Sequence, residues 1–175
     1  MECHQVRDYS EFYDQLNDVR DRFYRWDSCE RTVALYYLMT GLPFANARFL
    51  LHALEQCVQT VNTPEAQILE HNANNPVFVV NLLCQRPQVA LNSLLVHLPL
   101  LKPGNRDAVK SYLSTIRKVL MELVAPPFKI YNECVEIMSY IFIHPAFNKD
   151  DKKSFRQLLK KVSATVTCDK VTSEG

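Results

Sequence analysis

The pattern of apolar and polar positions is most informative over residues 26–61. Asp27 and Glu30 have the spacing of a capping box, which predicts a helix that begins at about Ser28. Every residue from 33 to 39 is apolar, so this run covers the whole circumference of a helix. We therefore expect the helix to be covered by other segments on more than one side.

A second helix is predicted from Pro43 to about Gln59. Gly41 is expected to end the first helix in the left-handed conformation, and proline suits a first helical position. Two adjacent apolar stripes follow at helical spacing, namely Phe44, Ala47, Leu51, Leu54, Val58 and Val61 beside Phe49, Leu50, Ala53 and Cys57. Two interpretations are open at this point. The helix pair is either buried in a single-chain core, which the pattern alone favours, or partly covered by a second copy of the chain.

The rest of the chain also reads as helices. Residues 8–25 form an amphipathic helix with an aromatic face, which serves either as core or as a contact surface for a dimer or a partner helix. Prolines 64, 76 and 87 each open a further helix, and the one over residues 76–84 is expected to be almost wholly buried. Longer helices are predicted over residues 106–124, from after Pro127 to His144, and from Asn148 or Asp150 onward. The sequence therefore predicts an all-α chain of eight or nine helices in antiparallel pairs.

The connection over residues 98–105 interrupts this helical pattern. Its two prolines remove backbone donors and clash with a preceding helical turn, so it cannot be regular helix. Asn105 is placed to cap the helix that follows.

Composition and charge exclude several functional classes. Lys plus Arg number 20 against 19 Asp plus Glu, so a net charge of +1 predicts no general attraction to nucleic acid or to an anionic membrane. The apolar stretches are too short for membrane insertion. The six cysteines show no paired spacing and are expected to be small buried thiols in a reducing compartment, and the N-terminus lacks the apolar core of a signal peptide. We expect a cytoplasmic protein.

No motif for catalysis is present. The five histidines have no spacing to a carboxylate or thiol that would suggest a metal centre, and no cofactor motif occurs, so we predict no enzyme, no metal and no cofactor. His97 and His144 are expected to contact backbone carbonyls at helix ends.

The last predicted helix carries a local run of basic residues. Lys152, Lys153, Arg156 and Lys160 lie mostly opposite its apolar stripe. A solvated outer face is the commoner explanation, and direct contact with nucleic acid is the alternative.

Five segments together carry a family resemblance. They are Trp26-Asp27-Ser28-Cys29-Glu30-Arg31-Thr32-Val33-Ala34-Leu35, Ala47-Arg48-Phe49-Leu50, Ala73-Asn74-Asn75-Pro76, Leu98-Pro99-Leu100-Leu101-Lys102-Pro103-Gly104-Asn105 and Ile143-His144-Pro145-Ala146. In this order they resemble the N-terminal domain of the Smaug family of post-transcriptional mRNA repressors, over roughly residues 18–162.

The resemblance implies a non-enzymatic module that homodimerises and recruits effector proteins. In that family a separate sterile alpha motif domain reads the RNA hairpin, so no direct nucleic-acid contact is expected from this chain alone. By analogy, residues 1–62 form a dimerising subdomain, residues 63–164 form a helical subdomain of pseudo-HEAT analogous topology packed on it, and residues 165–175 form a flexible tail. This analogy favours the dimer over the single-chain core.

Two sets of site residues follow from this interpretation. The dimer interface is assigned to Phe12, Tyr13, Leu16, Tyr36, Tyr37, Phe49 and Leu50. A groove for an amphipathic helical peptide of an effector is assigned to Trp26, Phe78, Leu82 and Leu101.

Overall fold

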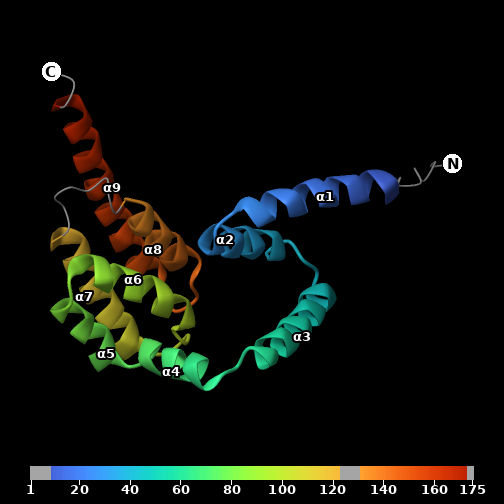
Figure 1. Cartoon of the computed structure of the whole chain (residues 1–175), viewed down its shortest axis with the longest axis horizontal. Coiled ribbons are helices and arrows are strands. Elements are labelled where there is room, and N and C mark those ends of the chain that lie inside the picture. The colour runs from blue at the N-terminus through green and yellow to red at the C-terminus, as the bar shows by residue number, and fades with distance from the viewer. Residues whose placement is uncertain (1–8, 123–130, 173–175) are drawn as a thin grey trace. The chain divides into compact units, whose positions relative to one another are not determined.

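All regular secondary structure in the described part of the chain is helical. The computed structural model describes residues 9–122 and 131–172 (Figure 1). Over these ranges there are nine α-helices and no strand, which confirms the all-α prediction. They are α1 (Tyr9–Arg25), α2 (Ser28–Met39), α3 (Phe44–Thr60), α4 (Pro64–Ala73), α5 (Pro76–Asn81), α6 (Pro87–His97), α7 (Arg106–Glu122), α8 (Tyr131–Ile143) and α9 (Lys149–Thr172). Short 3-10 helices follow α5 at Leu82–Cys84 and α6 at Leu98–Leu100.

The chain divides into two compact units. The first contains α1 and α2 and ends at Gly41, and the second begins at Leu42. The expected subdomain boundary after residue 62 and the pseudo-HEAT topology remain predictions. The helix α9 continues to Thr172, past residue 165 where we expected a tail, and residues 173–175 lie outside the described residues. Over the described ranges, no helix combines the length and the apolar character that crossing a membrane requires.

Local signals in the sequence account for most helix ends. The Asp27 side chain accepts from the Glu30 N–H at 2.8 Å, and the Asp27 N–H donates to the Glu30 carboxylate at 3.0 Å, so the predicted capping box is present. Thr63 and Asn75 cap the helices that Pro64 and Pro76 begin. The expected role of Gly41 was wrong, because only Gly104 has a positive φ among the described glycines. Instead Thr40 ends α2 in a helical conformation, with its N–H on the Tyr36 carbonyl.

Helices α4 to α9 together form the core of the second unit. In Figure 1, α5 lies beside α7, and α6 packs on both α7 and α8. Leu91, Leu94, Ile116, Ile137 and Ile141 are fully buried there. Burial of such side chains contributes about 1.5–3 kcal/mol each, so this core stabilises the second unit by itself.

The helix α5 is less buried than the sequence suggested. Val79 is fully buried, but Val77 and Val80 are exposed. The helix also ends at Asn81 and tightens into a 3-10 turn, so it is too short to be surrounded by neighbours. A hydrogen bond from α7 also holds this helix, since the buried Thr115 hydroxyl donates to the Val79 carbonyl at 3.3 Å. The sequence pattern did not predict this bond.

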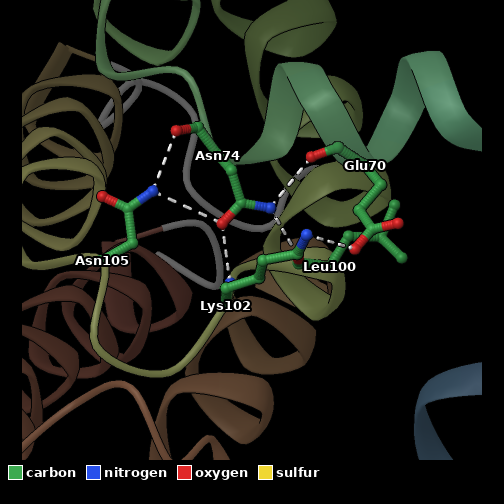
Figure 2. A network of polar contacts seen from close by, with 5 residues as sticks. All are labelled: Glu70, Asn74, Leu100, Lys102 and Asn105. Carbon is green, nitrogen blue, oxygen red and sulfur yellow. Dashed lines mark hydrogen bonds and ion pairs between the residues drawn. The ribbon is translucent and has the colours of Figure 1, made fainter.

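Asn74 joins the end of α4 to the connection over residues 98–105. Figure 2 shows its side-chain amide donating to the carbonyls of Glu70 and Leu100, both at 2.9 Å, while its oxygen accepts from the Lys102 N–H at 2.8 Å. The Asn105 side chain donates to the Asn74 carbonyl at 2.9 Å. Asn105 also caps α7, as expected, by accepting from the Ala108 N–H. The side chains of Asn74 and Asn105 thus hold the connection against the end of α4.

His144 fixes the other side of the same connection. Its Nδ1 accepts from the Ala146 N–H at 3.1 Å, and the ring also forms a hydrogen bond with the Pro99 backbone. His97 likewise contacts a backbone carbonyl, with Nδ1 2.7 Å from the Ser93 oxygen. His97 therefore has the predicted contact with a carbonyl at a helix end, whereas His144 mainly accepts from the backbone N–H of Ala146 after its helix. Desolvation, and then the nearby Lys152, lower the pKa of His144.

Acidification is expected to destabilise the fold through His144. Because its folded-state pKa lies below the unfolded value of 6.5, the unfolded chain binds more protons, and the free energy of unfolding falls as the pH drops below about 6.5. Urea unfolding between pH 8 and pH 5 measures this slope. In His144→Phe the slope over this window should be shallower, and an identical slope would contradict the role of His144.

Candidate protein-interaction surfaces

The first unit is held together at the turn between α1 and α2. The Arg31 guanidinium donates to the carbonyls of Phe23 at 3.0 Å and Tyr24 at 2.8 Å, at the C-terminal end of α1. It also lies 5.6 Å from the centre of the Phe23 ring, which in turn packs edge-on against Trp26. Sequence reasoning missed this clamp, although an arginine soon after a helix end is a known partner for terminal carbonyls.

The predicted interface residues of the first unit are all exposed. Phe12, Tyr13 and Leu16 are exposed on α1, and Tyr36 and Tyr37 are exposed on α2. Tyr36 and Tyr37 contact each other edge-on, with ring centres 5.5 Å apart. The single chain therefore leaves this aromatic surface in contact with solvent.

Burial in the first unit is correspondingly small. Over residues 10–41, Cys29 is the one buried side chain. The apolar run of α2 ends in Leu35 to Met39, all of them exposed. The first unit by itself therefore does not cover this helix, and the choice between a single-chain core and a second copy of the chain stays a prediction.

The helix α3 of the second unit likewise leaves its apolar side chains exposed. None of its residues is buried. Phe44 is 83% exposed, Phe49 70% and Leu50 37%, and both apolar stripes of the helix are open to solvent. Cys57 on this helix is exposed, as is Cys84, so the expectation of buried thiols holds only for Cys29 and Cys134 among the four cysteines whose surroundings are described.

The predicted groove residues differ in accessibility. Leu82 and Leu101 are 1% and 2% exposed and belong to the core of the second unit. Phe78 is half-buried, with its ring 4.9 Å from that of His97, and Trp26 of the first unit is half-buried as well. A partner could therefore reach Phe78 and Trp26 directly, and the groove itself stays a prediction.

The basic residues of α9 lie mainly on the surface. Lys153, Arg156 and Lys160 are exposed and Lys152 is half-buried. The Arg156 guanidinium lies 5.3 Å from the centre of the Phe142 ring on α8, so it is partly engaged within its own unit. Nucleic-acid contact by these residues stays a prediction.

No arrangement suited to a metal ion occurs in the part of the chain that the structure describes. Groups of three or more His, Cys, Asp or Glu side chains that could hold one are absent there. The chemistry that the described surface offers is apolar and aromatic contact, concentrated on α1, α2 and α3.

Comparison with known proteins identifies relatives over most of the chain. The profile of the SMAUG-like PHAT domain matches residues 66–167. Protein Smaug homolog 1 of Xenopus laevis is 36% identical over 148 residues, the Homo sapiens homolog 1 is 34% identical over 148, and Protein Smaug of Drosophila melanogaster is 27% identical over 202. In each case 85% of this chain is aligned. The match spans 20% of each relative's length, so the chain corresponds to about one fifth of those proteins.

Proposed function

Because this chain belongs to the Smaug family, we propose that it is a non-enzymatic, homodimeric protein-interaction module of a cytoplasmic translational repressor. In this proposal the mRNA is bound by a separate sterile alpha motif domain of the full protein. The module described here recruits effector proteins to that mRNA.

The observation that carries the proposal is the uncovered apolar surface of α1, α2 and α3. A unit of about 40 residues buries too little surface to be stable alone, and oligomerisation is one usual remedy. The single buried side chain over residues 10–41, Cys29, supports such a partner for the first unit. A second copy supplies the same aromatic residues and makes a self-complementary contact.

Dimerisation also explains how the module contributes to repression. Two copies carry two RNA-binding domains in one assembly, and binding of the first domain raises the effective concentration of the second near the same transcript. The gain is in avidity and needs no base contact from this chain. Effectors are proposed to dock by an amphipathic helical peptide, whose apolar face would meet accessible side chains such as Phe78 of the second unit.

The mass of the purified chain in solution tests the proposal. Analytical ultracentrifugation over a wide concentration series should give about twice the chain mass of 20.3 kDa, and this value should persist on dilution into the low micromolar range. A monomer at every concentration would overturn the dimer and, with it, the avidity argument.

A further inference from the structure

A surface hollow lies beside the C-terminal half of α4. Its volume is about 480 Å³, and its lining includes Gln67, Glu70 and His71 of α4, Pro76 of α5 and Lys102 of the connection to α7. All of these residues belong to the second unit. The hollow thus combines opposite charges, amide groups and a proline ring in one place.

The frame of the hollow is fixed by hydrogen bonds. The Asn74 side chain, which also lines it, forms hydrogen bonds with the backbone of Glu70, Leu100 and Lys102 (Figure 2), so α4 and the connection are joined at the hollow. A site whose backbone is fixed before binding loses little conformational entropy when a ligand enters.

The charges at the rim are paired but exchangeable. The Lys102 ammonium lies 3.0 Å from the Glu70 carboxylate, and the two side chains are 64% and 46% exposed. Such an exposed ion pair contributes about 0–1 kcal/mol, so opening it costs little. Lysine has three donors and glutamate about four acceptor positions, so each group can contact a ligand while it keeps part of the pair.

We propose that this hollow binds an extended peptide segment of an effector protein that carries one acidic and one basic residue on the same side. The acidic residue pairs with Lys102 and the basic residue with Glu70. Side chains at alternate positions of an extended peptide point to the same face, about 7 Å apart, so one short segment can reach both charges. The residue between them or beside them can rest on Pro76.

Charge complementarity favours this ligand over an anion. Glu70 and Lys102 sum to zero charge, so a polyanion such as RNA gains no net attraction and meets a carboxylate at the rim. A peptide that carries both an acidic and a basic residue can instead form one ion pair with Lys102 and another with Glu70. This proposal rests on the proposed function as a protein-interaction module, but it does not require that the chain be a dimer.

The probe is a phage-displayed library of random peptides, selected on the full purified chain. Enriched peptides should share an acidic and a basic position, and synthetic versions can be measured by fluorescence anisotropy. The double variant Glu70→Lys with Lys102→Glu retains an ion pair and the net charge, but reverses their order. It should weaken binding at least about tenfold, because like charges then face each other. A peptide with its two charged residues exchanged should bind this variant better than it binds the original chain.

A second charge reversal serves as the matched control. Asp107 and Lys110 form an exposed pair on α7, 3.7 Å apart, and reversing them in the same way should leave the affinity unchanged. No enrichment of mixed-charge peptides, or equal binding to the Glu70 and Lys102 double variant, would overturn the proposal. Ultracentrifugation of the same samples tests the two proposals separately. A monomeric chain that binds the peptides would contradict only the proposed dimer. A dimeric chain that binds no peptide would contradict only the proposed peptide site.

Discussion

Replacing Phe49 and Leu50 by aspartate is expected to convert the proposed dimer into a monomer. Both side chains are exposed in the single chain, and both lie on α3, where no residue is buried. Two carboxylates placed without partners in an apolar contact cost at least about 4 kcal/mol, which corresponds to a dissociation constant about a thousandfold higher. Sedimentation of the double variant at the concentrations used for the original chain measures the change.

A matched substitution shows whether the effect belongs to this face. Val96 on α6 is 52% exposed and lies outside the three helices assigned to the interface, so Val96→Asp should remain dimeric. Circular dichroism should show equal helix content in both variants, because neither position contributes to a buried core. A Phe49→Asp and Leu50→Asp variant that still sediments as a dimer would remove α3 from the interface.

Replacing Asn74 by alanine is expected to lower the free energy of unfolding by about 3 kcal/mol. The substitution removes two side-chain hydrogen bonds that join α4 to the connection, at the Leu100 carbonyl and the Lys102 N–H, and a third to the Glu70 carbonyl within α4. Each such hydrogen bond contributes about 1 kcal/mol net to stability. Urea unfolding followed by circular dichroism measures the loss.

Asn81 provides the control for that experiment. It is exposed at the end of α5 and its side chain makes no cap hydrogen bond, so Asn81→Ala should change the stability by less than about 0.5 kcal/mol. Equal stability losses in the two variants would show that the Asn74 network contributes nothing beyond an ordinary asparagine.

The helices could be predicted because their ends are encoded locally. The side chains of Asp27, Thr63 and Asn75 each accept from free backbone donors two or three residues further on. The prolines at the first helical positions lack an N–H that would need a partner. A pattern in one short segment is therefore sufficient to identify them. The buried faces of α7 and α8 could be predicted for a similar reason, because helical periodicity alone places Ile116 and Ile137 inward.

Features that depend on distant parts of the chain could not be predicted in this way. No local pattern indicates the role of Asn74, because its partners Leu100 and Asn105 are 26 and 31 residues away. The pairing of Glu70 with Lys102 also depends on how the connection returns to α4. For α2 and α3, apolar composition indicated a need for cover, but composition carries no information about which surface supplies it.

The Asn74 network also has a consequence for how this surface can evolve. Asn74 holds the connection by main-chain atoms, namely the Leu100 carbonyl and the Lys102 N–H. Every amino acid offers that carbonyl, and every one except proline offers that N–H. The side chains at these two positions can therefore change while the path of the backbone is kept, so a substitution at Lys102 can alter the lining of the hollow without rebuilding the fold.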